Sequence, residues 1–452
     1  MVNILIPEET PSHNKGEAAI FVGMMESFKL LEDNVKVSMF SFDPETDAAN
    51  YGSKVNIIDA KGIMPSSLMF KSKGTAFKIL EYLAFLIKHS SFFLLHKMLG
   101  DKATNLLRRD VWQYYCGADL VILAHDSAFS PLYHSVLIIF FKYLKKSVVV
   151  YGASLRPVAK SAPFFKRLLH NSLTKFVFCR TDLVTLREKM SYEYLGKMGA
   201  DKTPFYLTGD LAFLVHPAPD ERIKVIMKQE GIETSKPIIG MTVSKNKVNF
   251  AFSDIDEYNR KEEKFIEIMG NVIDYLTKSI DATVVFIPHS IVQDGERDDR
   301  VLAQKVLQVV VNTSRVKVIM SEYSSEELKG LTGKFDFCIG TRLHFIIDAV
   351  SMLVPSIALA DKADFRIHGI IGEMLGQEKW VCNVEDLTSN ELIAKIEKGW
   401  RLRDKTRGEL QGAMVAIKKQ TMLNGKLLSD LIKNSNASGS VRGESSNIRQ
   451  VK

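Results

Sequence analysis

The sequence predicts an α/β fold in which two doubly wound parallel-sheet domains face each other across a cleft. Three observations support this prediction: the length of 452 residues, apolar runs that alternate with helical patterns, and a proline-rich break near the middle. A chain of this length is too long for one hydrophobic core, so two domains of ordinary size are expected. A hydrophobic content of 46% with 25% charged residues is typical of a soluble globular protein.

The first half of the chain alternates short apolar runs with helical segments. The runs at 118–124 and 147–151 are almost entirely apolar, as in strands that are buried on both faces of a parallel sheet. A first helix is expected over 17–31. Further strands are expected at 2–7, 35–40, 54–59, 176–179 and 205–207. This βαβ series indicates a doubly wound sheet.

Proline and polar residues at 216–220 and 235–237 mark a linker, after which the alternation starts again. An N-terminal domain is therefore expected over residues 1–220 and a C-terminal domain over 236–400. The second half has expected helices at 257–280, 299–312 and 390–401, and expected strands at 238–243, 283–287, 316–320, 335–339 and 356–359. Two such units match the B-type glycosyltransferase architecture, in which ligands bind at the carboxyl ends of the strands.

A long helix over 405–432 ends the folded chain and is expected to pack across both domains as a segment over 401–433. The Ser/Gly/Asn-rich residues 434–452 are expected to be disordered.

Composition limits the kinds of partner and compartment. The net charge of +7 is mild for this length and suits anionic substrates or an anionic membrane surface, whereas nucleic acid is not indicated. The four cysteines lie far apart without metal-ligand spacing, as expected for reduced thiols in the cytoplasm. The N-terminus lacks the basic region of a signal peptide, so a cytoplasmic location is predicted. The oligomeric state is not indicated.

The segment 340–344, Gly-Thr-Arg-Leu-His, has the features of an anion site. It joins a predicted strand to a predicted helix, with Gly340 in a tight turn. Thr341 is expected to cap the helix and to place Arg342 and His344 in its first turn. Free backbone N–H groups, a guanidinium and an imidazole together suit a phosphate or a carboxylate.

Asp348 lies four residues after His344, on the same helical face, and could orient the imidazole. An ordinary capped helix with a surface His–Asp pair explains the same residues. Taken alone, the two interpretations are balanced.

Further motifs extend the pattern along the chain. The segment 340–350 is followed by VPSIAL at 354–359 and DFRIHG at 364–369, and it is preceded by Asn14-Lys15-Gly16-Glu17, Tyr151-Gly152-Ala153-Ser154, Arg180, Thr208-Gly209-Asp210 and Pro288-His289-Ser290. In this order, over residues 3–380, the set resembles the polysaccharide pyruvyl transferase family. No single motif is very specific, but the ordered set is.

The resemblance implies an enzyme that transfers pyruvate from phosphoenolpyruvate onto two hydroxyls of a sugar, as a ketal, with release of phosphate. The acceptor would be a cell-surface polysaccharide or its lipid-linked precursor, and no cofactor or metal is implied. At the family's motif positions, His344 would be the general acid, and Arg342 and Arg180 would clamp the anionic donor. Because Arg180 belongs to the N-terminal domain, domain closure would assemble the site.

Other residues are implied to bind donor or acceptor: Asn14, Gly16, Glu17, Asp126, Ser154, Asp210, His289, Gly340, Thr341 and Arg366. Glu17 replaces the family's Asp and is either a base or an ordinary first-turn acid. Asp210 is either the base or a residue that holds its own turn. His289 is favoured as a site residue over a loop histidine.

Three departures from the family pattern concern substrate specificity. His125 and Asp126 stand where the family has a pair of glycines, so they are candidate specificity residues. Ala363 and Arg366 replace a Tyr and a Lys. These changes leave the fold prediction untouched and weaken the substrate prediction.

Residues 76–99 form an apolar stretch without a counterpart in the family core. Helical spacing places one set of residues on an apolar face, namely Ile79, Leu83, Leu86, Ile87 and Leu94, and the charges elsewhere exclude a spanning helix. Phe85 and Phe92 fall among the polar positions. The stretch is either a helix pair packed on its own domain or an interfacial contact with a membrane that carries the acceptor.

Two other functions are consistent with the fold. One is a nucleotide-sugar glycosyltransferase, against which the C-terminal half lacks a clear acidic pair for a ribose. The other is a non-catalytic glycan-binding relative, which Ala363 and the His125-Asp126 pair favour and which Arg180, Arg342 and His344 disfavour. No P-loop, Rossmann glycine fingerprint or metal-ligand motif is present.

Overall fold

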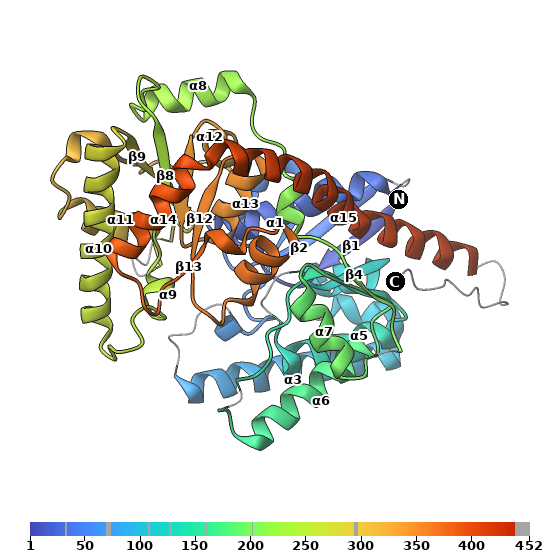
Figure 1. Cartoon of the computed structure of the whole chain (residues 1–452). Helices are drawn as coiled ribbons and strands as arrows, with labels where there is room; N and C mark the ends of the chain where they lie inside the picture. The colour runs from blue at the N-terminus through green and yellow to red at the C-terminus, as the bar shows by residue number, and fades with distance from the viewer. Residues whose placement is uncertain are drawn as a thin grey trace.

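The computed structural model of the chain describes residues 1–31, 34–68, 74–106, 109–125, 129–159, 161–200, 202–292 and 297–438. It confirms the predicted fold class, because the chain forms two parallel sheets with helices on both faces. Figure 1 shows the two α/β halves side by side, with the last helix lying across them.

The first sheet has seven parallel strands in the order β3-β2-β1-β4-β5-β6-β7. Its strands are β1 (Val2–Ile6), β2 (Val35–Ser41), β3 (Asn56–Asp59), β4 (Leu120–Ala124), β5 (Ser147–Ala153), β6 (Leu183–Leu186) and β7 (Phe205–Leu207). Its helices are α1 (Lys15–Ser27), α2 (Pro44–Tyr51), α3 (Thr75–Leu99), α4 (Arg109–Gly117), α5 (Pro131–Tyr143), α6 (Phe164–Phe178) and α7 (Lys189–Lys197). The interior strands are buried along their length, as their apolar runs predicted.

The second sheet has six parallel strands in the order β10-β9-β8-β11-β12-β13. Its strands are β8 (Ile238–Thr242), β9 (Thr283–Phe286), β10 (Val316–Val318), β11 (Phe337–Gly340), β12 (Ser356–Ala360) and β13 (Val381–Asn383). Its helices are α8 (Asp220–Gln229), α9 (Lys245–Val248), α10 (Tyr258–Ser279), α11 (Asp299–Leu307), α12 (Ser325–Thr332), α13 (Leu343–Ser351) and α14 (Ser389–Arg401), with a π-helix, η7, at Ile367–Met374.

Helix α15 (Arg403–Ser438) packs on α1 and β6 of the first half and on α13 and α14 of the second. Its buried Asn424 accepts a hydrogen bond from the Thr208 hydroxyl at 3.0 Å and donates to the Gly209 carbonyl at 3.3 Å. The helix continues to Ser438, past the predicted start of a disordered tail at 434, because its last turns propagate the helical hydrogen bonding. The rest of that tail lies outside the described residues.

The predicted strand at 176–179 is wrong. These residues end α6, and the strand follows at β6. Val177 and Phe178 are buried, but from the last turn of a helix. A four-residue apolar run does not distinguish the end of a buried helix from a short strand. The carboxyl end of this strand is therefore at residue 186, whereas the prediction placed it at residue 179.

The apolar stretch 76–99 is the single helix α3, and its orientation is opposite to the prediction. Phe85 and Phe92 are buried, and Phe92 stacks on Trp112 with ring centroids 4.2 Å apart. The predicted apolar face, including Ile79 and Ile87, is exposed. Aromatic partners from α4 and α5 therefore decide which face of the helix is buried, and the spacing of α3 alone could not show them.

None of the helices in the described part of the chain is both long enough and apolar enough to cross a membrane.

Candidate functional site

A polar cavity of about 130 Å³ lies between the two domains, where α1 and α13 begin. These helices follow β1 and β11, which flank the points where the strand order of each sheet reverses. Open α/β sheets bind ligands at the carboxyl edge beside such points. The residues that line the cavity are Asn14, Gly16, Glu17, Ser244, Asn246, Lys247, His289, Thr341, Arg342, Leu343, His344, Asp364 and Arg366. Most of the predicted site residues are therefore brought together.

His344 lies in the first turn of α13, and its ring is held between two residues of the N-terminal domain. Its Nε2 is 3.7 Å from Oδ2 of Asp210, and its Nδ1 lies against the Cα of Gly16. The helix begins one residue later than predicted, since Arg342 is the N-cap. The Thr341 hydroxyl does not cap the helix, because it bonds to Ser244 Oγ at 3.2 Å.

Gly16 is required by this close approach, because a side-chain carbon there would overlap the imidazole of His344. Its backbone is not in the left-handed region, so the requirement is for space rather than for conformational freedom. Gly340 has a similar role, since a Cβ there would lie 2.6 Å from the ring of Phe345. Both glycines let elements pack closely, and Gly340 is the last residue of β11 rather than a separate turn.

We expect Gly16→Ala to lower kcat about 100-fold, because displacing a reacting group by about 1 Å can cost that much. The fold should survive, since the added methyl meets the movable ring of His344. Steady-state kinetics and thermal melting would measure both effects. Gly408→Ala is the matched control, because its Cβ would meet no atom within 4 Å. Equal activity in the two variants would contradict this use of Gly16.

Arg187, which the sequence analysis missed, lies behind His344 in a buried network. It follows β6, is fully buried, and donates to Asp210 Oδ2 at 2.9 Å and to Ser154 Oγ at 2.6 Å. Ser154 in turn donates to Glu188 Oε2 at 2.7 Å. The predicted ligand residue Ser154 is thus fully buried outside the cavity, where it links Arg187 to Glu188.

Arg180 does not reach the site, which corrects its assignment as an anion clamp. It follows α6 and precedes β6, so it lies at the amino edge of the sheet, opposite the cavity. Its guanidinium stacks on Phe176 at 3.8 Å and donates to the Phe176 carbonyl. The misplaced strand caused the error. The pair Arg187-Glu188, directly after the apolar run LVTL, was the signal for the arginine that follows this strand and donates to Asp210.

Asp210 faces the imidazole of His344, with 3.7 Å between Oδ2 and Nε2, which is beyond hydrogen-bond distance. Burial raises the pKa of its carboxyl, but Arg187 and His344 outweigh burial and hold that pKa well below its usual range. Asp210 is fully buried and also accepts from the Ala212 N–H at 2.9 Å. Of the two predicted roles, base or structural residue, the geometry favours a positioning role, because the carboxylate reaches the cavity only through His344.

Arg342 is oriented by Asp299, the first residue of α11. Its Nε and Nη2 donate to the two carboxylate oxygens of Asp299 at 2.5 to 3.2 Å. The same carboxylate accepts from the backbone N–H groups of His289 and Ser290 at 3.0 and 3.1 Å. A bidentate pair of this kind fixes the guanidinium plane at the edge of the cavity.

Asp348 pairs with His289 rather than with His344, which corrects the predicted orienting pair. His289 Nε2 is 3.4 Å from Asp348 Oδ2, and both side chains are buried. His289 Nδ1 is buried without a hydrogen-bond partner in the described chain. Because residue 289 follows β9, its position beside α13 depends on the sheet order, which helical spacing cannot reveal.

The other charged groups of the cavity form ion pairs. Lys247, which was not predicted, is buried and donates to Asp361 at 2.8 Å and to Asp364 at 2.7 Å. The Nε of Arg366 is 3.6 Å from Asp364. Across the cavity, the Asn14 amide donates to Glu17 at 2.7 Å.

The two domains are joined directly at this cavity. Residue 14 bridges Ser290, and the Lys15 N–H donates to the His289 carbonyl at 2.9 Å. The N-terminal end of α1 is thereby fixed against the C-terminal domain.

Comparison with known proteins identifies the family of the chain. Residues 14–362 match the sequence profile of the family described as polysaccharide pyruvyl transferase. The chain belongs to the polysaccharide pyruvyl transferase family. It is also similar to the amylovoran biosynthesis protein AmsJ of Erwinia amylovora, with 23% identity over 450 residues that cover 96% of this chain and 99% of that protein.

Solved structures share the fold of this family member at low sequence identity. A glycosyltransferase from Rickettsia africae superposes with a TM-score of 0.55 at 13% identity, over 97% of this chain and 98% of that one. A putative UDP-N-acetylglucosamine 2-epimerase from Listeria monocytogenes gives 0.59 at 14% identity, over 97% of both chains. A sucrose-phosphate synthase from Thermosynechococcus elongatus gives 0.56 at 12%, over 97% and 100%. They establish a B-type glycosyltransferase-like fold and no activity.

The candidate specificity residue His125 of this pyruvyl transferase family member lies at the carboxyl end of β4, where its Nε2 is 2.7 Å from the Thr10 hydroxyl and its Nδ1 is 3.3 Å from Glu8. Glu8 also pairs with His134. Burial raises the pKa of Glu8, but the two histidines outweigh it and lower that pKa. His125 is thus held at the edge of the sheet that faces the cleft. Asp126 lies outside the described residues.

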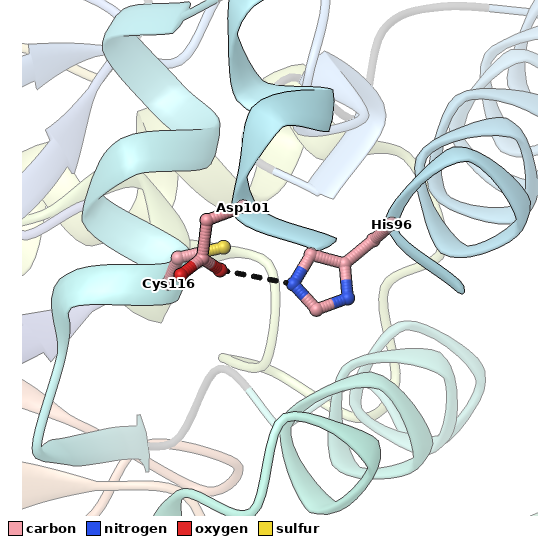
Figure 2. A group of neighbouring side chains, drawn as sticks. All are labelled: His96, Asp101 and Cys116. Atoms are coloured by element: carbon pink, nitrogen blue, oxygen red, sulfur yellow. Dashed lines mark hydrogen bonds and ion pairs between the residues drawn. The ribbon is translucent and has the colours of Figure 1, made fainter. Parts of the chain in front are cut away.

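One group in the described part of the chain could hold a metal ion: His96, Asp101 and Cys116 (Figure 2). It lies among α3, α4 and the turn between them, and none of its residues lines the cavity. His96 Nε2 is 3.2 Å from Asp101. Burial raises the pKa of the Cys116 thiol to about 11, which disfavours the thiolate that a metal requires.

Proposed function

We propose that this family member transfers pyruvate from phosphoenolpyruvate onto two hydroxyls of a sugar, as a ketal, during polysaccharide synthesis. The observation that carries the proposal is the polar cavity in which His344, backed by Asp210, lies beside Arg342. The proposed place of work is the cytoplasm, where phosphoenolpyruvate is made. No cofactor and no metal are part of the proposal.

The cations of the cavity suit the two anionic groups of the donor. Arg342 is fixed by Asp299 and partly exposed to the cavity, so it can grip a phosphate or carboxylate. Lys247 and Arg366 are two further cations of the cavity, and Asp361 and Asp364 are their acidic partners. In the proposed complex, Arg342 keeps its predicted role as one clamp of the donor. Lys247 and Arg366 take the role that was predicted for Arg180.

His344 acts as the general acid. A proton from the imidazolium passes to the methylene carbon of the donor, and positive charge develops at the carbon that bears the phosphate ester. Asp210 stabilises the imidazolium because it remains ionised. A first sugar hydroxyl then forms a C–O bond to the cationic carbon and loses its proton to a base. The second hydroxyl forms the other C–O bond as the bond to phosphate breaks, and phosphate leaves with the second hydroxyl proton.

Glu17 is the proposed base for the sugar hydroxyl. It lines the cavity on the side of the N-terminal domain, whereas Asp210 is buried behind His344. The acceptor would therefore enter from the N-terminal domain and meet the donor at the C-terminal one.

The size of the cavity favours a small donor over a nucleotide sugar. A volume of about 130 Å³ is well below the roughly 300–1,000 Å³ of sites for drug-sized ligands. The volume limits only the size of the donor, because the acceptor would occupy the open cleft outside the cavity.

Incubation with phosphoenolpyruvate and a panel of free and lipid-linked sugars would test the proposal, through phosphate release and the mass of the product. Release of phosphate together with a pyruvylated sugar is expected. Nucleotide release from sugar nucleotides, without any reaction of phosphoenolpyruvate, would contradict the proposal and favour a glycosyltransferase.

Arg342→Ala is expected to weaken the use of phosphoenolpyruvate about 10- to 100-fold in kcat/KM, since charge-assisted hydrogen bonds contribute about 1.5–3 kcal/mol. Saturation kinetics with the donor varied would measure the loss. Arg315→Ala is the matched control, because Arg315 pairs with Asp281 away from the cavity. The donor clamp would be refuted if Arg342→Ala behaved like the control.

A further inference from the structure

An exposed apolar surface covers the outer side of the N-terminal domain. More than half of the exposed large apolar side chains in the described residues belong to α3, α5 and α6. On α3, Ile79, Leu83 and Ile87 form a stripe, and on α6 the first turn carries Phe164 and Phe165, which are 68% and 80% exposed. Contiguous surfaces of this kind mark interaction sites. We name it the α3–α6 face.

The helices of the α3–α6 face form one layer. The inner sides of α3, α5 and α6 share a single hydrophobic core with the sheet, and α5 packs against both of the others. Figure 1 shows α3 and α6 together at the lower edge of the molecule, away from α15. The exposed side chains therefore project outwards from the same layer.

The charge of this face is strongly one-sided. The helices α3, α5 and α6 carry Lys and Arg at seven positions, of which Lys142 pairs with Asp182, and one acidic residue, Glu81. The whole chain is far more balanced, with 60 basic and 53 acidic residues. Glu81 is turned towards the preceding loop, where it accepts from the Ser67 N–H at 2.8 Å. Apolar side chains among basic ones are complementary to an anionic lipid surface.

A second copy of the chain is a poorer match for the same face. Two-fold pairing would bring the basic residues of both copies together. A bilayer supplies the opposite charge and takes up the protruding phenylalanines. Since no helix in the described residues is suited to span a membrane, the face would lie on the bilayer.

An apolar groove of about 690 Å³ lies between α6, which lines it through His170 and Thr174, and the segment at 363–366 that borders the candidate site. Phe129 and Leu155 line it on the N-terminal domain, and Ala363 and Phe365 line it on the C-terminal domain. Asp364 and Arg366, which alternate with these last two residues, line the site cavity. The alanine at 363, in place of the tyrosine of many relatives, leaves room in the groove.

We infer that the α3–α6 face docks on an anionic bilayer and that the groove admits a lipid-linked sugar from that bilayer to the cavity. The docking stands on the face alone, whereas the identity of the acceptor rests on the proposed function. The inference replaces the predicted contact through Phe85 and Phe92, which are buried.

Vesicle flotation of the full chain would test the docking. We expect binding to vesicles of equimolar phosphatidylcholine and phosphatidylglycerol, and much weaker binding to phosphatidylcholine alone. Phe164→Ser/Phe165→Ser should weaken binding about tenfold or more. Lys97→Glu/Lys166→Glu should remove the preference for the anionic lipid. The control is Val311→Ser/Val415→Ser, which removes exposed valines elsewhere and should bind as the wild type does.

Three outcomes would overturn the inference. The first is a wild type that does not float with anionic vesicles. The second is a phenylalanine variant that floats as well as the valine control. The third is a dimer, detected by light scattering, that the phenylalanine substitutions alone dissociate. Thermal melting of all variants would identify misfolded protein, and Leu83→Gln then serves as a second change on the face. Vesicle binding without pyruvyl transfer to any sugar would overturn the proposed function and leave the docking intact.

Discussion

Replacing His344 with alanine is expected to lower kcat by a factor of about 10²–10⁴, the usual contribution of a general acid. The imidazole is flanked by both domains, with α13 beneath it and Gly16 and Asp210 across from it. Its loss leaves no acid to protonate the methylene carbon of phosphoenolpyruvate. Binding of phosphoenolpyruvate should change much less, because Arg342 keeps its contact with Asp299. Single-turnover phosphate release at saturating donor would measure the effect.

His368→Ala is the matched control for this prediction. His368 lies in the π-helix η7 and pairs with Glu378 at 2.8 Å, outside the cavity. Its removal should leave kcat within about twofold of the wild type, as expected for a residue that does not touch the reacting atoms. A His344→Ala enzyme that retained wild-type single-turnover rates would remove His344 from the role of acid and leave Glu17 or Lys247 to be tested.

The fold could be predicted because its signals are local. Strands that are buried on both faces, such as β4 and β5, appear in the sequence as apolar runs, and helices of ordinary length separate them. The strand at 176–179 was wrong because a short apolar run has no period of its own. The orientation of α3 was wrong for a different reason: its buried face is chosen by Trp112 and other aromatic partners distant in sequence.

The part of the site that one continuous segment forms could be predicted. The contacts between segments that are distant in sequence could not. The helix N-terminus at 342–344 could be inferred from a strand, a glycine and a helix in succession. The partners of its side chains could not be inferred. His344 meets Asp210 rather than Asp348, because the loop after β7 and the start of α1 approach α13 from the other domain. The acceptor side stays a prediction: Asn14 and Glu17 line the cavity and His125 follows β4, whereas Asp126 lies outside the described residues.

Arg187→Met is expected to lower the free energy of unfolding by about 3–5 kcal/mol, as when one partner of a buried ion pair is removed. Arg187 is fully buried between Asp210 and Glu188, so its loss removes the countercharge of Glu188 and leaves Asp210 with His344 alone. Burial already raises the pKa of Glu188, against the opposing effect of Arg187. Activity should fall too, because Asp210 would no longer be held against His344. Urea denaturation and phosphate release would measure the two effects.

The pH dependence of that loss separates charge from packing. In the wild type the pKa of Asp210 lies below its usual range, because Arg187 and His344 outweigh the effect of burial. The stability due to this carboxylate is therefore present above the unfolded pKa of about 3.9 and is lost as the pH falls through the folded value. Without Arg187, burial is opposed only by His344 and the Ala212 N–H, so the pKa of Asp210 should rise relative to the wild type and the variant should recover part of its deficit as the pH is lowered towards 4. Arg180→Met, at the exposed arginine first assigned to the site, should cost less than about 1 kcal/mol, since it loses one exposed cation–π contact and one exposed hydrogen bond, both to Phe176. A deficit of Arg187→Met that is small or constant between neutral pH and pH 4 would mean that packing, rather than charge, gives Arg187 its place behind His344.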